Sequence, residues 1–210
     1  MSRINLEHVR AALALDGFDA EDAQRRMAPQ PRVLRRSENR AGSPRQASVM
    51  ILLYPLDDQL AMALVRRSEN EHDVHSGQIG LPGGAREGDE TAVETALRET
   101  GEELGVTAGV EVIGALTPLY IPPSDFEVRP VVGHLAHRPT WVPDPAEVVD
   151  VLECPVDWLL DDERKAGEDW DFGGYKLYVP WYDLHGHRVW GATAIILSEF
   201  EQRLRRVVGR

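Results

Sequence analysis

Apolar residues recur with helical spacing near both ends of the chain and form short continuous runs between them. The first periodic stretch predicts a short amphipathic helix over residues 5–15. The second predicts a longer helix over 191–208, with basic residues near its C-terminal end, where the helix dipole favours them. The two periods are carried by Leu6, Val9 and Leu13, then by Ile196, Phe200, Leu204 and Val207.

The apolar runs between these helices are partly β-branched and indicate strands. Residues 47–55 and 60–67 are separated only by the sequence LDDQ, which favours a strand pair. Further strand candidates are 109–121, 126–136, 147–156 and 175–181. Strands and helices alternate around what reads as one core, so the pattern predicts a single domain of the α/β or α+β class.

A segment rich in Arg, Pro and Ser precedes the first strand. Residues 25–46 read RRMAPQPRVLRRSENRAGSPRQ, which indicates an irregular arm and no separate domain. We therefore expect residues 1–45 to form a helix and an arm that pack on a domain formed by residues 46–210.

Composition adds the expectation of a cytoplasmic protein. The 210 residues are 42% hydrophobic and 28% charged, and no apolar run is long enough to span a bilayer. The start of the chain lacks a signal-peptide pattern. Cys154, the one cysteine, has no internal disulfide partner, which fits a reducing compartment.

The charge is unevenly distributed. The formal net charge is −12, and residues 1–45 hold nine arginines against six acidic residues, so residues 46–210 carry about −15. An acidic body is unsuited to non-specific binding of nucleic acid. If its substrate is anionic, cations or local arginines must offset the repulsion; plain solubility is the alternative explanation of the acidity.

One helix in the middle of the chain has readable ends. Thr91 and Glu94 form the pattern of a capping box, and Gly105 supplies a C-terminal stop, so the helix is expected at about 92–104. The predicted inner stripe of this helix consists of Val93, Ala96, Leu97, Thr100 and Leu104.

Three glutamates lie off that stripe. Glu99, Glu102 and Glu103 are neighbours at helical spacing, and like charges so placed destabilise a helix. Either this face is merely solvated, or it binds a hard divalent cation, for which carboxylate oxygens are suitable ligands. The loop PGG at 82–84 allows a close backbone approach to a ligand, and Arg98 can pair with a carboxylate just ahead of the helix.

The spacing of these residues resembles the signature of the Nudix hydrolases, G-x5-E-x7-R-E-U-x-E-E-x-G-U. The matching positions are Gly84, Glu90, Arg98, Glu99, Glu102, Glu103, Gly105 and Val106. Thr100 departs from the pattern, because a bulky aliphatic residue is usual there. The resemblance implies an α/β/α sandwich around a mixed β-sheet, with the signature over residues 84–106. It also implies hydrolysis of a nucleoside diphosphate linked to another group.

The resemblance also implies roles for individual residues. Glu99, Glu102 and Glu103 would bind Mg²⁺ or Mn²⁺, with Glu99 the general base in some members. The carbonyl of Gly84 would also contact the metal. Arg98 and Glu90 would form an orienting ion pair. An acid outside the signature often assists, and Glu147 is our candidate, with an ordinary loop carboxylate as the alternative.

The segment upstream resembles the coenzyme A pyrophosphatases within this family. Their pattern, roughly LLTxRS…RxxxGQxxFPGG, is similar to residues 63–84, and residues 25–32, 120–133 and 189–197 also resemble that subgroup. The implied substrate-binding residues are Arg67, His75, Gln78, Gly83, Tyr120, Ser124 and Phe126. Three features depart from that pattern. The loop after Ser68 is one residue longer, the expected arginine aligns with Asp73 (or with His72 if the gap shifts), and Leu81 replaces a phenylalanine.

Several alternatives stay open at this point. The expected substrate is coenzyme A or an acyl derivative, with ADP-ribose, NADH or another nucleotide diphosphate as alternatives. A Nudix-fold module that binds a nucleotide without cleaving it is a rival of a different class. A small-molecule substrate is expected, with no nucleic-acid or membrane partner, and a homodimer is one alternative for the assembly. The histidine pairs His72/His75 and His185/His187 lack the further ligands of a zinc site.

Overall fold

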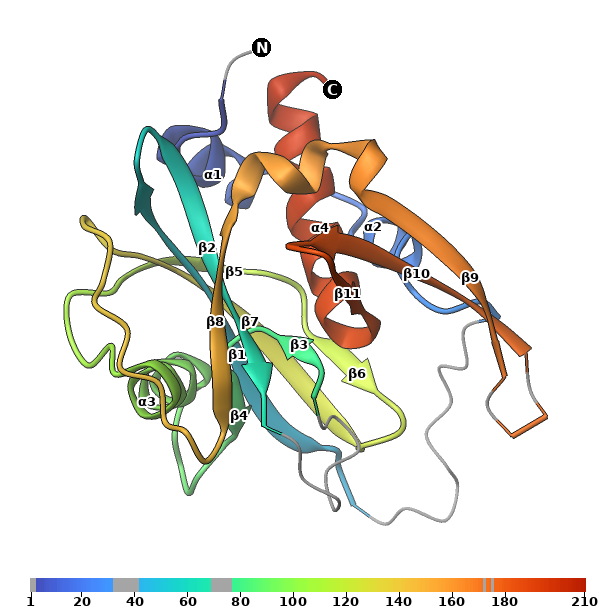
Figure 1. Cartoon of the computed structure of the whole chain (residues 1–210), viewed down its shortest axis with the longest axis horizontal. Helices are drawn as coiled ribbons and strands as arrows, with labels where there is room; N and C mark the ends of the chain where they lie inside the picture. Colours follow the sequence, from blue (N-terminus) through green and yellow to red (C-terminus); the bar gives the residue numbers. More distant parts are fainter. Residues whose placement is uncertain (1–2, 32–41, 69–76, 172, 175) are drawn as a thin grey trace.

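A computed structural model of the chain describes residues 3–31, 42–68, 77–171, 173–174 and 176–210 (Figure 1). The helices are α1 (Leu6–Leu13), α2 (Ala20–Arg25), α3 (Ala92–Leu104) and α4 (Gly191–Val208), with 3₁₀ turns η1 (Val156–Leu160) and η2 (Asp162–Arg164). The strands of the main sheet are β1 (Arg45–Leu56), β2 (Gln59–Arg67), β3 (Ile79–Gly80), β4 (Gly83–Ala85), β5 (Glu111–Ala115), β6 (Leu119–Ile121), β7 (Phe126–His134) and β8 (Val148–Pro155). A smaller sheet contains β9 (Lys165–Asp171), β10 (Lys176–Leu184) and β11 (His187–Trp190).

The main sheet is mixed. Its central order is β3-β2-β1-β7-β5, and β4, β6 and β8 pair with β1, β7 and β2 respectively. β1 and β7 run parallel, from Arg45 opposite Phe126 to Leu53 opposite His134, whereas the other pairs are antiparallel. The β1–β2 hairpin turns at Asp57, which has a positive φ of 51°, and Leu56 pairs with Gln59, so the strand pair predicted around LDDQ is confirmed.

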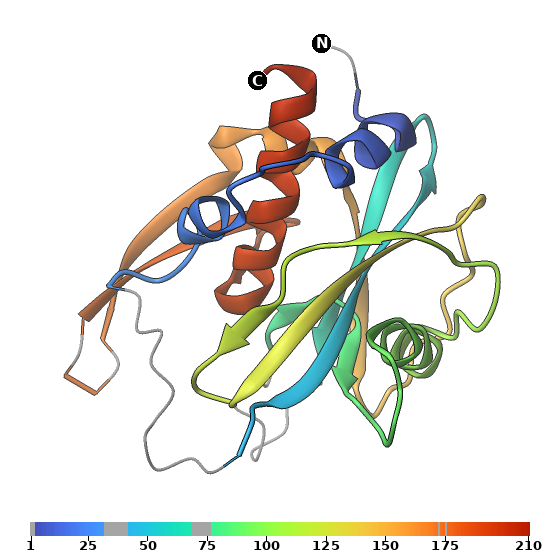
Figure 2. The ribbon, with the colours of Figure 1, turned by 180° about the vertical axis from the view of Figure 1, so that it is seen from behind.

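Helices cover both faces of this sheet. Alternate residues of β1 point to opposite sides, with Ile51 and Leu53 in one buried cluster and Met50 and Leu52 in the other. The first cluster includes side chains of α1 and α4, and the second includes side chains of α3. Figures 1 and 2 show α3 on one side of the sheet and α1 with α4 on the other. This layering confirms the predicted α/β/α sandwich.

Several predicted elements are found and others were missed. The helices around 5–15, 92–104 and 191–208 and most predicted strands are present, but residues 109–121 form two strands, β5 and β6. Pro118, which has no backbone N–H to donate, lies between these strands. The helix α2 and the strands β3, β4, β9 and β11 were not predicted, and Gly83 and Gly84, expected in a loop, belong to β4 because it pairs with β1. The turn at His185 and Gly186 joins β10 to β11, with positive φ at both residues.

The N-terminal segment lies against the C-terminal helix. α1 and α2 both contact α4, and Met27 and Ala28 of the predicted arm are buried. Gln30 forms an isolated bridge with Tyr178 of β10. In the described part of the chain, no helix has the length and apolarity needed to cross a membrane.

Candidate active site

The helix α3 has the ends that its sequence predicts. The amide of Glu94 donates to Oγ1 of Thr91 (3.3 Å), and the amide of Thr91 donates to Oε2 of Glu94 (2.7 Å), which completes the capping box. At the other end Gly105 has a φ of 74° and its amide donates to the carbonyl of Gly101 (3.0 Å). The signature helix therefore begins and ends where local interactions fix it.

The buried face of α3 differs from the predicted stripe. Val93 is exposed (37%) and Leu97 is only half-buried, whereas Thr95 and Glu103 are buried. The prediction that all three glutamates lie off the buried side was therefore wrong for Glu103. The helix turns Glu103 towards β4 because that carboxylate accepts a hydrogen bond from the strand. Thr100, the departure from the signature, is fully buried, and its hydroxyl is paired because it donates to the carbonyl of Ala96 (2.6 Å).

The glycines of β4 lie directly against the glutamates. The amide of Gly83 donates to Oε2 of Glu103 (2.9 Å). A Cβ atom added to Gly84 would overlap with the carboxylate of Glu99. A Cβ atom added to Gly83, which has a φ of 151°, would overlap with the backbone of Ser48 on β1. The backbone therefore requires glycine at position 83, whereas a side chain at position 84 would have to displace the Glu99 carboxylate.

Arg98 connects the segment between β4 and α3 to the carboxylates on α3. Its guanidinium binds Glu90 through Nε (2.7 Å) and NH2 (3.1 Å), and NH2 also donates to the carbonyl of Ala85 (2.9 Å). NH1 donates to Glu99 (2.9 Å) and to Glu102 (2.8 Å). These bonds from Arg98 hold the pKa of Glu90 at about 2, well below its usual range. The structure thus brings Arg98 and Glu90 together as the sequence predicts.

Glu103 is the most buried acid of the group, with 2% of its surface exposed. Burial raises its pKa to about 7, and the charges of Glu99 and Glu147 act in the same direction. The amide of Gly83 and the guanidinium of Arg67, 3.5 Å away, oppose this shift. Burial also raises the pKa of Glu99, again with a contribution from Glu147. Glu147, the predicted acid outside the signature, therefore interacts electrostatically with two of the three signature glutamates, Glu99 and Glu103.

These residues fit a divalent cation. Within the described residues, no three acidic, histidine or cysteine side chains already converge as they do around a bound metal. Glu99, Glu103 and Glu147 nevertheless repel one another, as their effect on pKa values indicates, and carboxylate oxygens are hard ligands. A cation such as Mg²⁺ or Mn²⁺ bound there would remove this repulsion. Glu102 is exposed and at present bonded to Arg98.

The predicted substrate residues form two groups. Arg67 and Gly83 contact the carboxylate of Glu103, and the amide of Arg67 donates to the carbonyl of Gln78 (3.0 Å). Tyr120, Ser124 and Phe126 lie at the β6–β7 hairpin, where the hydroxyl of Tyr120 donates to Oδ1 of Asp125 (3.0 Å). His75 lies outside the described residues.

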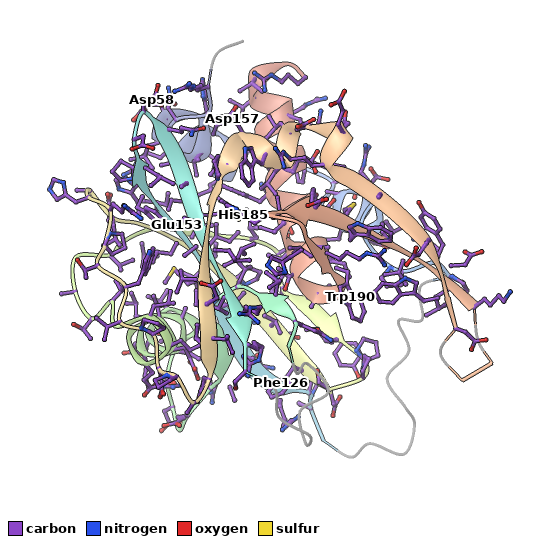
Figure 3. All side chains as sticks on the ribbon, viewed as in Figure 1. Asp58, Phe126, Glu153, Asp157, His185 and Trp190 are labelled. Carbon is purple, nitrogen blue, oxygen red and sulfur yellow. The ribbon has the colours of Figure 1, made fainter. Side chains whose placement is uncertain are left out.

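The second group is nevertheless at the same end of the sheet. Phe126 lies opposite Arg45 on β1, and Gly84 lies opposite Ser48, three residues further along the same strand. Figure 3 shows Phe126 at this end of the sheet. Arg45, which we did not predict, donates to the carbonyl of Ser124 (2.9 Å) and stacks on Phe126 with its Cζ 4.0 Å from the ring centre. Its place in an arginine-rich arm offered no signal to single it out.

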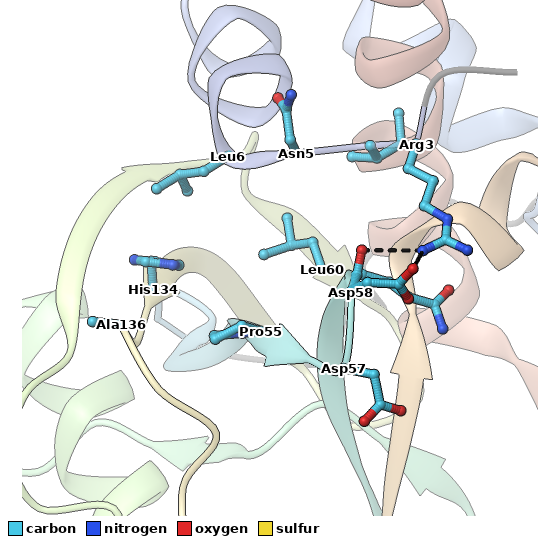
Figure 4. Close-up of a pocket in the computed structure, with 11 residues that line it drawn as sticks. Arg3, Asn5, Leu6, Pro55, Asp57, Asp58, Leu60, His134 and Ala136 are labelled. Atoms are coloured by element: carbon cyan, nitrogen blue, oxygen red, sulfur yellow. Dashed lines mark hydrogen bonds and ion pairs between the residues drawn. The ribbon is translucent and has the colours of Figure 1, made fainter.

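A separate cavity lies at the opposite end of β1 (Figure 4). It has a volume of about 480 Å³ and contains none of the signature residues. Its walls include Leu6, Leu60 and His134, and an ion pair between Arg3 and Asp58 lies at one side. The chemistry predicted from the sequence is therefore not located in this cavity.

Comparison with known proteins agrees with the geometry. The NUDIX domain family matches residues 44–176. The chain is 36% identical to Nudix hydrolase 22, chloroplastic, of Arabidopsis thaliana over 73% of its length and 53% of that protein. It is 34% identical to the mitochondrial coenzyme A diphosphatase NUDT8 of Mus musculus over 86% of its length and 87% of that protein. The chain thus spans about half the length of the plant relatives but most of the mouse protein.

Solved structures support the fold. The crystal structure of the Nudix hydrolase RenU from M. smegmatis superposes with a TM-score of 0.52 at 21% identity, covering 83% of this chain and 92% of that chain. A MutT/nudix family protein from Enterococcus faecalis superposes with a TM-score of 0.53 at 16% identity, covering 100% of this chain and 82% of that chain. With the family match over 44–176, the signature helix and the glycine strand in place, the chain belongs to the Nudix family.

Proposed function

We propose that this protein hydrolyses the diphosphate of a nucleoside-diphosphate-linked metabolite, with coenzyme A or an acyl derivative as the substrate. The observation that carries the proposal is the group of acidic side chains around β4, where Glu99, Glu103 and Glu147 repel one another beside a glycine strand. Nudix proteins generally use divalent cations, and this acidic group is where Mg²⁺ or Mn²⁺ would bind.

Coenzyme A is favoured over other diphosphates on two grounds. The upstream segment resembles the coenzyme A pyrophosphatases, and the similar mouse protein is named a coenzyme A diphosphatase. The expected products are 3′,5′-ADP and 4′-phosphopantetheine, or its acyl derivative. ADP-ribose-type and other nucleotide diphosphates remain the alternative, and a binding module without catalysis is the second alternative.

The proposed reaction adds water across one P–O–P linkage. The oxygen of water forms a bond to one phosphorus, the bridging P–O bond breaks, and the second phosphate leaves with the bonding electrons. A bound cation would neutralise the diphosphate and acidify water. Glu99 is our candidate to accept the water proton, and the raised pKa of Glu103 makes that carboxylate a second candidate.

The surrounding residues position these groups. Arg98 holds Glu99 and Glu102 and is itself held by Glu90. Gly83 and Arg67 orient Glu103. Arg67, whose NH1 lies 3.5 Å from Oε1 of Glu103, is our candidate to contact a substrate phosphate. Catalysis in this proposal comes from positioning and charge neutralisation.

The test is product analysis by mass spectrometry. The protein is incubated with Mg²⁺ or Mn²⁺ and coenzyme A, acetyl-coenzyme A, ADP-ribose, NADH or oxidised deoxynucleoside triphosphates, with Glu103→Gln as the control. Metal-dependent release of 3′,5′-ADP that is lost in the control supports the proposal. Cleavage of ADP-ribose or NADH alone supports the first alternative, and metal and nucleotide binding without cleavage supports the second.

The cellular compartment and the assembly also stay predictions. The plant and mouse relatives are named as mitochondrial or chloroplastic proteins, whereas the sequence of this chain favours the cytoplasm. A homodimer is testable by light scattering of the purified protein.

A further inference from the structure

The segment between β7 and β8 crosses the C-terminal end of α3 and bonds to its last carbonyls. The amide of Val142 donates to the carbonyl of Leu104 (3.0 Å), and the amide of Asp144 donates to the carbonyl of Glu103 (3.2 Å). Carbonyls in the last turn of a helix have no partner within the helix. The segment therefore satisfies these carbonyls and is tied directly to the backbone of a proposed catalytic glutamate.

Asp144 then folds the chain into a turn that carries Glu147. The carboxylate of Asp144 accepts from the amide of Ala146 (2.9 Å), and its carbonyl accepts from the amides of Glu147 (3.0 Å) and Val148 (2.8 Å). An aspartate that bonds to the backbone two residues further on builds such a turn locally. Residues 144–147 are called the Glu147 turn below.

Ser68 binds the same turn from the opposite side. Its amide donates to the carbonyl of Glu147 (2.8 Å), and its hydroxyl donates to the carbonyl of Ala146 (2.7 Å). The β2–β8 ladder changes register between Arg66 and Arg67, immediately before this contact. Such an irregularity re-aims the end of a strand, and here it leads to a serine that makes two bonds to one turn.

We propose that Ser68 is a positioning residue, whose amide and hydroxyl hold the Glu147 turn against the end of α3 that carries Glu103 and so fix the position of the Glu147 carboxylate. The inference rests on the proposed function, because it gives Glu147 a part in cation binding. Among the described residues, Ser68 bonds to the backbone carbonyls of Ala146 and Glu147 and to no carboxylate of the site. Its effect must therefore pass through the turn.

Removal of the Ser68 hydroxyl leaves the hydrogen bond from the Ser68 amide to the carbonyl of Glu147 in place, so we expect a partial loss of the hold on the turn and no complete release. Glu147 is exposed, and the neighbouring contacts with Asp144 remain. Loss of one intramolecular hydrogen bond should weaken the hold on the turn by roughly three- to tenfold. Ser68→Thr keeps a hydroxyl and should therefore retain most of the wild-type hold on the turn.

The experiment compares Ser68→Ala, Ser68→Thr, Glu147→Gln and the double variant Ser68→Ala/Glu147→Gln. Ser198→Ala is the matched control. The hydroxyl of Ser198, on α4 and far from the candidate active site, also donates to a backbone carbonyl, that of Ala23 (2.7 Å). Two measurements need no substrate: hydrogen exchange of a peptide covering residues 141–151, and Mn²⁺ affinity by calorimetry. Turnover of coenzyme A is the third.

In Ser68→Ala we expect exchange at residues 146–148 to accelerate about threefold or more and Mn²⁺ affinity to fall roughly three- to tenfold, with neither change in Ser198→Ala. In the Glu147→Gln background, Ser68→Ala should change Mn²⁺ affinity by less than twofold, because the group it positions is already gone. An equal loss in both backgrounds, or unchanged exchange and affinity in Ser68→Ala, overturns the proposal. Failure to cleave any substrate, with the exchange and affinity effects present, contradicts only the proposed function.

Discussion

Glu103 combines burial with an unusual protonation equilibrium. Its pKa rises from the ordinary 4.5 to about 7, mainly because burial disfavours the charged form. A carboxyl whose folded pKa is raised binds its proton more tightly in the folded state. The contribution of Glu103 to the stability of the folded protein is therefore greatest below pH 4.5 and is lost as the pH rises through 7.

We therefore predict that Glu103→Gln stabilises the protein in EDTA at pH 8, by about 2 kcal/mol, while abolishing hydrolysis. The difference should shrink as the pH falls to 5, where Glu103 is largely protonated in the folded protein. Urea unfolding at the two pH values measures it. Equal stability of the wild type and Glu103→Gln at pH 8 would show that ionisation of Glu103 does not destabilise the folded protein.

Arg98 is predicted to act through geometry and not through charge alone. Its planar guanidinium bonds to Glu90, Glu99 and Glu102 at once, which the ammonium of lysine cannot reproduce. Arg98→Lys should reduce kcat by roughly 10- to 100-fold, the usual effect of losing a partner that orients metal ligands. Steady-state kinetics measure this, with Arg25→Lys on α2 as control. Unchanged kcat in Arg98→Lys would mean that a positive charge suffices.

The strand β4 and the helix α3 fit each other through two glycines, and substitution should separate their roles. Gly84→Ala overlaps only the end of the flexible Glu99 side chain, so stability should change by less than about 1 kcal/mol. Displacement of that carboxylate should nevertheless lower kcat about 100-fold.

Gly83→Ala meets the backbone of Ser48 at a strained φ, and should lose about 1–3 kcal/mol of stability. Thermal unfolding and kinetics on both variants test the pair. The reverse pattern, an unstable Gly84→Ala with normal kcat, contradicts this assignment.

Elements with strong local signals were predictable, and elements that depend on distant contacts were not. The capping box of Thr91 and Glu94 lies within four residues, so the sequence alone places the start of α3. The buried side of α3 depends instead on β4, and Glu103 therefore faces inward although its charge predicts exposure. β9 has mostly exposed and charged residues, and it forms because β10 pairs with it.

Site residues show the same division. The glutamates of α3 follow from their spacing, but Arg45 and Ser68 act through partners about 80 residues away in the chain. Hydrogen bonds of that range leave no periodic pattern in the sequence. Only the parallel pairing of β1 with β7 brings Arg45 to Phe126.

At the scale of the whole molecule, α4 joins the N-terminal helices to both sheets through buried acids. Glu201 accepts from Lys165 of β9 (2.6 Å) and from the hydroxyl of Tyr182 on β10 (2.6 Å). Glu199 accepts from Gln24 of α2 (2.9 Å) and from the hydroxyl of Thr117 ahead of β6 (2.9 Å). Both acids are 1% exposed. The helix α2 is therefore hydrogen-bonded into the same interior as the two sheets.

This connection makes the cooperativity of unfolding a test of the architecture. Glu199→Ala leaves the guanidinium of Arg203, 3.0 Å from the carboxylate, and the amide of Gln24 without their buried partner. Breaking a buried charged pair in this way typically costs about 3–5 kcal/mol, so Glu199→Ala should lose that much stability, whereas Glu163→Ala at an exposed position should lose little.

Circular dichroism and tryptophan fluorescence should follow one coincident urea transition in the wild type, because α2, α4 and the sheets share one core. An early, separate loss of helical signal would mean instead that the N-terminal helices unfold independently of the Nudix sandwich.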